Sequence, residues 1–396
     1  MSYQDRWQQR LQQRRQQGLY RRRQVVDSAQ AAVVETGDRQ LINFCSNDYL
    51  GLASHPKVIE AFRRAANRYG VGSGASHLVC GHGRLHHQLE EALADFTGRE
   101  QALVFSSGYQ ANLGVISALL GPGDKVYQDR LNHASLLDGG LLSRAQFARY
   151  RHSDVSHCAQ LLTKAGEGEK LLATDSVFSM DGDIAPVPEL AALARQHDAL
   201  LMVDDAHAIG YLGNNGGGST DYYRLSTADV PILMGTLGKA LGTFGAFVAG
   251  SEALIEMLVQ FARSYIYTTA LPPAVAAATL ASLELVKTEA WRRERIQDHV
   301  KRFRTQALDL GYRLMPSETA IQPILVGTAQ QAIELSQRLQ QSGIWVSAIR
   351  PPTVPEGGSR LRVTLCAHHQ DQHLDQLLYA LAEARSVVID ADYVDV

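Results

Sequence analysis

The sequence lacks most features of secreted, membrane-spanning or nucleic-acid-binding proteins. Its four cysteines, Cys45, Cys80, Cys158 and Cys366, lie far apart and form no CxxC pair, so neither a disulfide framework nor a structural zinc site is expected. No run of about 18 apolar residues occurs, which excludes a transmembrane helix. The 38 basic and 41 acidic residues give a net charge of −3, so no strong positive field attracts nucleic acid or an anionic membrane.

The start of the chain also lacks the apolar segment of a secretory signal. Residues 4–23 are instead rich in glutamine and arginine, and Trp7 and Leu11 lie at helical spacing. This pattern predicts a solvated surface helix that ends near Gly18. The missing signal and the scattered cysteines together favour a cytoplasmic protein.

The length of 396 residues, with 45% hydrophobic and 20% charged residues, is typical of a globular enzyme of two packed units. Residues 100–250 repeat an order of apolar strand, polar or glycine turn and helix, which predicts βαβ units around a mostly parallel sheet. From about Gly311 a strand–helix–strand pattern predicts a smaller α/β unit. We therefore expect an α/β fold with an N-terminal helical segment (1–44), a large domain (45–290) and a small C-terminal domain (291–396).

Ligands of such sheets bind outside the carboxyl ends of the strands. Four polar or glycine-rich segments of the large domain follow predicted strands and are expected at this edge: residues 106–109, 175–183, 204–207 and 235–239.

The segment GTLGKALG places Lys239 between small residues. Most lysines are solvated surface charges, but a lysine that a ligand can approach closely is desolvated and has a lowered pKa, which suits a Schiff base. A phosphate-binding P-loop is the main alternative. It does not fit, because Ala240 follows the lysine and no glycine stands five residues before Gly238.

Two further patterns stand at predicted strand ends. Asp204 and His207, in VDDAH, follow an apolar run. One aspartate there is more often a turn residue, but beside a Schiff-base lysine it can pair with a protonated pyridine nitrogen. Ser107, Gly108 and Tyr109 stand where a helix is predicted to begin, and free N–H groups at a helix start bind phosphate. The same pattern also describes a simple helix cap.

Together these parts resemble the aspartate-aminotransferase-like (fold type I) pyridoxal-phosphate enzymes and, among them, the α-oxoamine synthases. The narrower resemblance covers nearly the whole chain and rests on SNDYLGL (46–52), GSGAS (72–76), LNHASLLDG (131–139), DSVFSMDGD (175–183), YTTALPP (267–273) and LRVTLCAHH (361–369). LYRRR (19–23) and AIRPPTVPEG (348–357) look like the biotin-pathway branch of this family. The resemblance implies a seven-stranded sheet between helices.

It also implies that pyridoxal 5′-phosphate is the cofactor. Lys239 would hold it covalently and move protons at the substrate α-carbon, Asp204 would pair with the ring nitrogen, and His133 would stack on the ring; these three are the expected catalytic residues. His207 and Ser179 would bind near the ring oxygen. The other expected cofactor contacts are Ser107, Gly108, Tyr109 and Thr236, with Thr268 or Thr269 reaching the phosphate of the neighbouring subunit.

The implied reaction is that of a decarboxylating C-acyltransferase, which condenses L-alanine with a pimeloyl thioester, on CoA or acyl carrier protein, in a homodimer with shared active sites. Two alternatives are another α-oxoamine synthase, such as one that joins glycine and acetyl-CoA, and a non-catalytic pyridoxal-phosphate-binding protein. The resemblance also implies substrate-binding residues. Asn47 and Arg362 match positions that bind the amino-acid carboxylate, and Arg21, Arg350 and Thr353 match positions on the side of the acyl substrate. His133 is expected to contact the substrate as well as the cofactor.

Two groups of histidines are left outside the expected site. His368, His369 and His373 lie close in sequence, but no carboxylate or cysteine set completes a metal site, so they are interpreted as polar residues at the start of a helix. His77 and His82 lie in GSGASHLVCGH, where the sequence departs from the more glycine-rich family pattern. No metal is expected.

Overall fold

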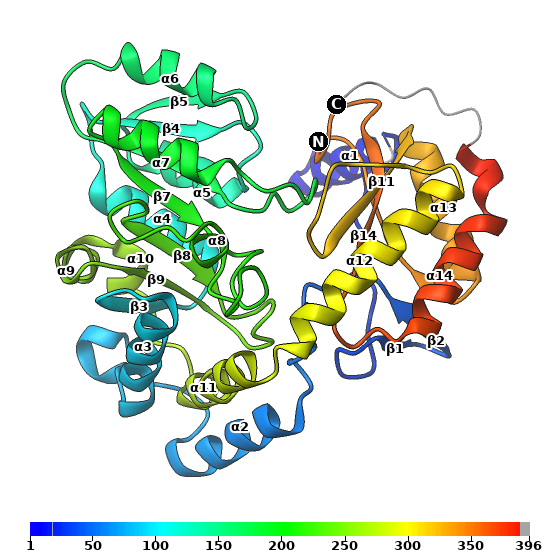
Figure 1. Cartoon of the computed structure of the whole chain (residues 1–396), viewed down its shortest axis with the longest axis horizontal. Coiled ribbons are helices and arrows are strands. Elements are labelled where there is room, and N and C mark those ends of the chain that lie inside the picture. The colour runs from blue at the N-terminus through cyan, green and yellow to red at the C-terminus, as the bar shows by residue number, and fades with distance from the viewer. Residues whose placement is uncertain (18, 389–396) are drawn as a thin grey trace.

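Seven strands form the central sheet of the larger of two lobes in the computed structural model, which describes residues 1–17 and 19–388 (Figure 1). The strand order is β3-β9-β8-β7-β6-β4-β5. Neighbouring strands run parallel except at β9, which is antiparallel to both β3 and β8. The mostly parallel sheet predicted from the sequence is thus confirmed. The strands are β3 (Gln101–Phe105), β4 (Lys125–Asp129), β5 (Gln146–Tyr150), β6 (Lys170–Asp175), β7 (Leu200–Asp204), β8 (Ile232–Thr236) and β9 (Ala246–Gly250).

Helices cover both faces of this sheet because its strands are apolar on both sides. In β6, Leu171 and Ala173 belong to one apolar cluster with α4 and α9, whereas Leu172 belongs to another with α6 and α7. The helices of this lobe are α2 (Pro56–Tyr69), α3 (Arg84–Thr97), α4 (Gly108–Leu119), α5 (Ala134–Leu142), α6 (Val155–Thr163), α7 (Val187–Gln196), α8 (Ser219–Tyr223), α9 (Glu252–Phe261), α10 (Arg263–Ile266) and α11 (Pro273–Thr288). A π-helical turn, His77–Gly81, precedes α3.

The smaller lobe contains a four-stranded sheet of order β10-β11-β14-β13 and a three-stranded sheet of order β1-β2-β12. Its elements are β1 (Val33–Thr36), β2 (Arg39–Asn43), α12 (Trp291–Asp309), β10 (Arg313–Leu314), β11 (Ile321–Gly327), α13 (Ala329–Gln341), β12 (Ile344–Trp345), β13 (Ser347–Ile349), β14 (Ser359–Thr364), α14 (Asp371–Glu383) and a 3₁₀ turn, Arg385–Val388. These strands and helices confirm the smaller α/β unit expected near the C-terminus.

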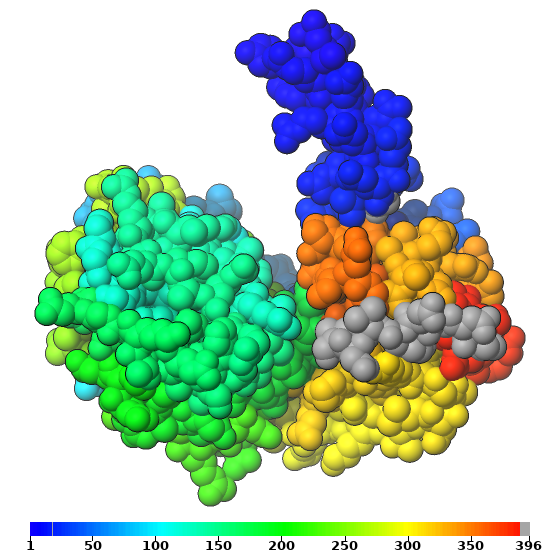
Figure 2. Space-filling view, turned by 90° about the horizontal axis from the view of Figure 1, so that it is seen from above, coloured from blue at the N-terminus to red at the C-terminus, as the bar shows by residue number. Residues whose placement is uncertain are grey.

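Among the described residues of the first segment, helix is confined to α1 (Tyr3–Gln16). This helix has no buried residue and projects from the smaller lobe (Figure 2). The expected helix end at Gly18 lies outside the described residues. Further on, β1 and β2 form a hairpin whose turn contains Gly37 at φ 58°, a conformation that glycine adopts without steric cost. Strand β2 pairs in parallel with β12, so residues 33–43 fold with the smaller lobe.

The expected domain division remains a proposal, and two structural features bear on it. The long helical pattern after Pro273 is split into α11 and α12, with Glu289 and Ala290 between them, which agrees with a boundary near residue 290. We propose that the hairpin of residues 33–43 belongs to the smaller domain, although it precedes the boundary placed at residue 45. None of the helices in the described ranges combines the length and apolarity needed to span a bilayer.

Candidate active site

A cavity of about 200 Å³ lies at the carboxyl edge of the large sheet. Strands β3, β6, β7 and β8 end there, at Phe105, Asp175, Asp204 and Thr236, as the four polar segments predicted. Eight residues expected at the site line the cavity: Gly108, Tyr109, His133, Ser179, Asp204, His207, Thr236 and Lys239. Five further lining residues had no predicted individual role. Of these, Asp175 and Ala206 lie within the segments expected at this edge, and the other three are Asn112, Ser135 and Met234.

Lys239 reaches the cavity from the loop after β8. Its Nζ lies 2.9 Å from Nε2 of His207. Burial lowers the pKa of the lysine to about 8, although the nearby carboxylates of Asp204 and Asp175 oppose the shift. Because so low a pKa leaves a large fraction of the amine neutral near pH 8, Lys239 is suited to attack a carbonyl.

Asp204 is held at the floor of the cavity by the strand end and a neighbouring helix. Its Oδ1 accepts a hydrogen bond from the backbone N–H of Ala206 at 2.9 Å, and its Oδ2 accepts one from Asn112 Nδ2 at 2.7 Å. The same amide donates to Ser135 Oγ at 2.9 Å, which lies 2.7 Å from Nδ1 of His133. This network fixes the carboxylate and the imidazole relative to each other.

Asp175 is a second buried carboxyl group at this edge, directly opposite Asp204 in the β6–β7 pairing. Burial, and then the charge of Asp204, raise its pKa well above the usual range. Its Oδ2 accepts the backbone N–H of His133 at 2.7 Å. Asp175 therefore positions the loop that carries His133, and its burial favours the protonated form of its carboxyl group.

The N-terminus of α4 forms another wall. Ser107 caps the helix, since its Oγ accepts the N–H of Gln110 at 3.2 Å. The first N–H groups of a helix have no acceptor within it and attract anions. A Cβ on Gly108 would lie 2.9 Å from Cγ2 of Thr236, so only glycine lets these two segments approach so closely. Tyr109 hydrogen-bonds to Asp138 and meets the ring of His133 edge-on, with centroids 6.2 Å apart.

The donors and acceptors of the cavity fit pyridoxal 5′-phosphate. An aldehyde needs an amine, which Lys239 offers; a pyridinium needs a carboxylate, which Asp204 offers; and a phosphate needs free N–H groups, which the start of α4 offers. Oδ1 of Asn112 is buried without a hydrogen-bond partner. A polar group bound in the cavity would satisfy this atom.

A buried chain of hydrogen bonds connects Lys239 to the smaller lobe. Nδ1 of His207 lies 2.6 Å from Oη of Tyr49, which donates to Oδ1 of Asn47 at 3.4 Å. The same Asn47 oxygen accepts Nη2 of Arg362 at 3.1 Å. Arg362 also donates through Nε to the backbone oxygen of Ser179 at 2.6 Å. Asn47 and Arg362 do not line the cavity, but this chain ties both to it.

The other predicted residues lie elsewhere. Arg21, Arg350 and Thr353 line a separate cavity of about 210 Å³ at the base of α1. Thr268 and Thr269 do not line the cavity around Lys239; Thr269 instead pairs with Ser76 in an isolated β-bridge. Ser107 acts as the helix cap rather than as a lining residue. The roles of all these residues stay predictions.

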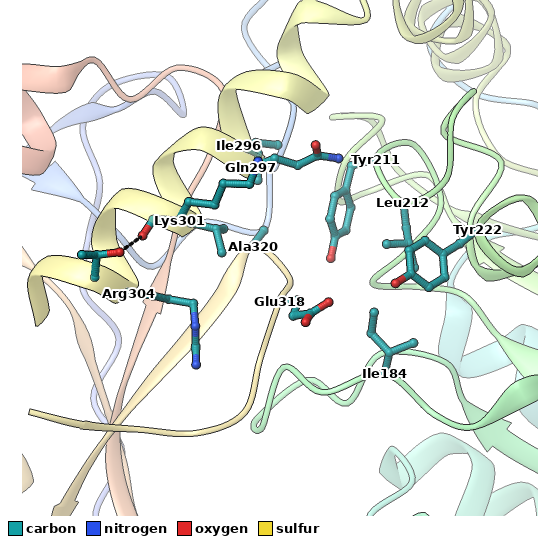
Figure 3. Close-up of a pocket in the computed structure, with 12 residues that line it drawn as sticks. Ile184, Tyr211, Leu212, Tyr222, Ile296, Gln297, Lys301, Arg304, Glu318 and Ala320 are labelled. Atoms are coloured by element: carbon teal, nitrogen blue, oxygen red, sulfur yellow. Dashed lines mark hydrogen bonds between the residues drawn. The ribbon is translucent and has the colours of Figure 1, made fainter. Parts of the chain in front are cut away.

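A larger cavity, of about 530 Å³, lies between the lobes and is lined by none of the predicted residues (Figure 3). Tyr211 and Tyr222 of the larger lobe face Gln297 and Lys301 of α12 across it, with Glu318 between them. Its walls are mostly apolar. Because the lysine, the aspartate and the helix start all meet in the smaller cavity, we propose that one as the cofactor site.

No individual role was predicted from the sequence for Tyr49, Asn112, Ser135 or Asp175, although the segment that begins with Asp175 was expected at this edge. Tyr49, Ser135 and Asp175 stand within the quoted segments SNDYLGL, LNHASLLDG and DSVFSMDGD, and a polar residue at an expected strand end was the available signal for Asp175. Asn112 lies inside α4 among apolar neighbours. A polar residue on an otherwise apolar helix face was the signal for it.

Known proteins resemble this chain over nearly its whole length. The model of the family "Aminotransferase class I and II" matches residues 39–381. An 8-amino-7-oxononanoate synthase from Saccharophagus degradans is 58% identical over 385 residues, 97% of each chain, and one from Thioalkalivibrio sulfidiphilus is 59% identical over 372 residues, 94% of this chain and 95% of that one. A serine palmitoyltransferase from Sphingomonas wittichii superimposes with a TM-score of 0.93 at 32% identity, covering 98% of this chain and 99% of that one.

A family model that spans most of the chain, together with full-length relatives at this identity, establishes the family. The fold is that of the fold type I enzymes among these relatives, one of which is described with a pyridoxal-phosphate internal aldimine. The chain belongs to the aminotransferase class I and II family.

Proposed function

We propose that this chain is a pyridoxal 5′-phosphate-dependent acyltransferase that condenses L-alanine with a pimeloyl thioester, releasing CO₂ and the free thiol carrier to give 8-amino-7-oxononanoate. Curated relatives with this activity in their names are 58–59% identical over almost the whole chain. The observation that carries the proposal within the structure is the meeting of Lys239, Asp204 and His133 in one cavity.

The cofactor, when bound, withdraws electrons from the α-carbon of alanine, so that a bond at this carbon can break. Asp204 is proposed to stabilise the positive charge on the ring nitrogen, and the hydrogen bonds from Asn112 and Ala206 support a fixed position of its carboxylate. His133 is proposed to cover the ring face. Its link through Ser135 to the same asparagine supports that position.

Lys239 is proposed to hold the cofactor and then, once alanine has displaced it, to take the proton from the alanine α-carbon and later return one. A pKa of about 8 supports this role, because a base near the working pH can both accept and donate a proton. His207, 2.9 Å away, is proposed to orient the amine. Between the two proton transfers the α-carbon bonds to the thioester carbonyl, the thiol leaves, and the carboxyl group departs as CO₂.

Arg362 and Asn47 are proposed to bind the carboxylate of alanine. A bidentate guanidinium fixes the plane of a carboxylate, and this orientation decides which α-carbon bond stands perpendicular to the ring. Arg362 is already held by Ser179, Thr364 and Asn47. Such support limits the ordering that substrate binding still requires.

The acyl substrate is proposed to contact the second cavity, where Arg21, Arg350 and Thr353 meet. A homodimer with shared active sites is part of the proposal. Its support is the exposed apolar surface around Thr269, where Val71 is 83% exposed, Val79 77% and Tyr267 71%. Patches of this kind usually mark interfaces. We also propose that the enzyme acts in the cytoplasm; its four cysteines are free.

A substrate panel tests the proposed function. The purified holoenzyme is incubated with L-alanine, glycine or serine and with pimeloyl-CoA, acetyl-CoA or palmitoyl-CoA, and thiol and CO₂ release are measured. We expect turnover to be fastest with L-alanine and pimeloyl-CoA. Preference for glycine with acetyl-CoA, or no turnover with any pair, would contradict the proposal in favour of a sibling synthase or a non-catalytic protein, neither of which the relatives favour.

A further inference from the structure

Four histidines and a partly buried glutamate lie close together at the start of α3, outside the cavity described above. Among the described residues, the ligating atoms of His82, His87 and Glu90 all lie within 4.8 Å of one another. His82 precedes the helix, and the other two stand three residues apart on its first turns. Two ligand atoms bound to one zinc ion lie roughly 3–3.5 Å apart. Small rotations of the exposed side chains of His82 and His87 would therefore bring the three ligand atoms to the distances needed to bind one ion.

Glu90 is the least ordinary member of this group. One of its oxygens, Oε1, accepts the backbone N–H of Val104 at 3.0 Å, and the other, Oε2, faces Nε2 of His82 at 3.9 Å. The side chain is only 13% exposed. No lysine or arginine pairs with it in the described part of the chain, so an incoming cation would supply the missing charge.

His82 is oriented as a metal-binding imidazole usually is. Its Nδ1 shares a hydrogen bond of 2.9 Å with Nδ1 of His77, and the ring of His77 stacks on Tyr265 with centroids 4.9 Å apart. When Nδ1 of His82 donates this bond, its Nε2 keeps a free lone pair toward Glu90.

Two other buried histidines, His86 and His369, use both ring nitrogens in hydrogen bonds within the protein. His86 accepts the N–H of Gly83 through Nδ1 at 2.9 Å and bonds to the backbone oxygen of Leu271 through Nε2 at 2.6 Å, so neither nitrogen is free. His369, in the C-terminal histidine cluster, similarly accepts the N–H of Cys366 and bonds to the oxygen of Asn43. Within the described ranges, only His82, His87 and Glu90 bring two imidazoles and a carboxylate close enough together to share one metal ion.

We propose that His82, His87 and Glu90 form a binding site for a divalent transition-metal ion of the Zn²⁺ type, separate from the cofactor cavity. Two imidazoles and one carboxylate are ligands that such ions prefer, and they leave further positions open to water or to the nearby Glu91, which His87 already approaches to 3.4 Å. The site is independent of the proposed enzymatic activity.

Zinc titration of the tag-free, chelator-treated holoenzyme tests the proposal. Calorimetry should detect one Zn²⁺ per chain with a dissociation constant in the micromolar range or below. His87→Ala, at an exposed position, should weaken binding at least about tenfold. Glu90→Gln, which keeps an oxygen for Val104, should do the same. His373→Ala removes a similarly placed histidine on the first turn of α14 and should leave binding unchanged.

X-ray absorption at the zinc edge supplies a second measurement, in which two imidazole nitrogens at about 2.0–2.1 Å are expected. Circular dichroism shows whether each variant is folded. If Glu90→Gln unfolds, the zinc affinity of His87→Ala alone decides whether the proposed site exists. Absence of stoichiometric binding, or binding that His87→Ala leaves intact, would overturn the proposal. Loss of binding in His373→Ala would overturn it as well, because the ion would then sit elsewhere.

Discussion

The amine of Lys239 is the residue on which the proposed chemistry depends. Lys239→Ala should abolish the visible absorbance of the lysine-bound cofactor and lower turnover by about 1000-fold or more, because both covalent capture and proton transfer are lost. Absorbance spectra and thiol release check the two effects. Lys287→Ala, which removes an exposed lysine 3.6 Å from Glu284, is the matched control and should change neither.

The lowered pKa of Lys239 predicts how cofactor capture depends on pH. Only the neutral amine attacks the aldehyde, and the neutral fraction rises as pH passes through the pKa of about 8. The rate at which the apoenzyme binds pyridoxal 5′-phosphate should therefore rise between pH 7 and pH 9 and level off above that. Stopped-flow absorbance measures this rate. A midpoint above pH 10 would mean that the amine is not desolvated.

Tyr49 is expected to act through His207 rather than on the substrate. Tyr49→Phe removes the 2.6 Å contact with Nδ1 of His207 and should lower kcat by about tenfold, the effect of losing one buried hydrogen bond. In a His207→Asn background the same substitution should have little further effect, because contacting residues are not additive. Full additivity in this double-mutant cycle would show that Tyr49 has a separate role.

For individual site residues, the sequence predicts those that directly follow strands. It does not predict those that a helix places in the cavity. Lys239, Asp204 and His207 were predictable because strand ends are visible as apolar runs that stop at polar residues. Asn112 was not, because it reaches Asp204 only through the packing of α4 against β8 and β9 of the sheet. The face that a short helix turns toward a sheet edge is set by tertiary contacts.

At the level of secondary-structure elements, the charged imidazole of His152 holds the loop of residues 175–183 in place through its contact with Asp183. His152 contacts Asp129 through Nδ1 at 3.1 Å and Asp183 through Nε2 at 2.9 Å. Burial opposes its charge, but the hydrogen bonds to these two carboxylates prevail and raise the pKa of the ring to about 10. The loop carries Ser179, whose backbone oxygen holds Arg362, so this clamp supports the proposed carboxylate site.

The raised pKa of His152 gives a stability prediction with a definite sign. The folded-state pKa of about 10 exceeds the ordinary value of 6.5, so the stabilisation is complete below about pH 6.5 and is lost as pH rises through 10. His152→Gln should lower the melting temperature by roughly 5 °C at pH 6, and the difference from wild type should shrink toward pH 10. A difference that stays constant over this range would refute the charged clamp.

The cavity at the base of α1 gives a prediction for substrate binding. Arg350→Ala should raise the KM for pimeloyl-CoA by about tenfold, the loss expected for one charge-assisted hydrogen bond, and leave the KM for L-alanine unchanged. Arg338→Ala, on α13 and paired with Glu334 at 2.6 Å, is the control and should affect neither constant. Equal increases in both KM values would place Arg350 at the amino-acid side or in a structural role.

For the whole molecule, local sequence patterns predict the two lobes better than they predict the contacts between segments far apart in the sequence. The βαβ rhythm, the smaller α/β unit and the carboxyl edge of the sheet follow from residue periodicity within short windows. The pairing of β2 with β12 joins Ile42 to Ile344, about 300 residues away, and no local pattern encodes it. For the same reason the second cavity, which combines Arg21 with Arg350, was predicted only through family resemblance.

The shared active site can be tested by mixing two defective chains. If Lys239 of one subunit works with Thr268 and Thr269 of its partner, a dimer of one Lys239→Ala chain and one Thr268→Ala/Thr269→Ala chain has one site with all defects and one intact site. Coexpression with separate affinity tags allows the mixed dimer to be purified. Its activity should reach about half that of wild type, since one of two sites is whole.

The homodimers supply the comparison that makes this result specific. The Lys239→Ala homodimer should be inactive, and the double threonine variant should bind pyridoxal 5′-phosphate more weakly, because each of its sites lacks the proposed phosphate contacts. If all groups of one site came from one chain, the mixed dimer would combine one dead site with one threonine-deficient site and would show half the activity of the threonine variant. Measuring turnover at limiting cofactor separates the two cases, since only an intact site keeps its affinity for the cofactor there.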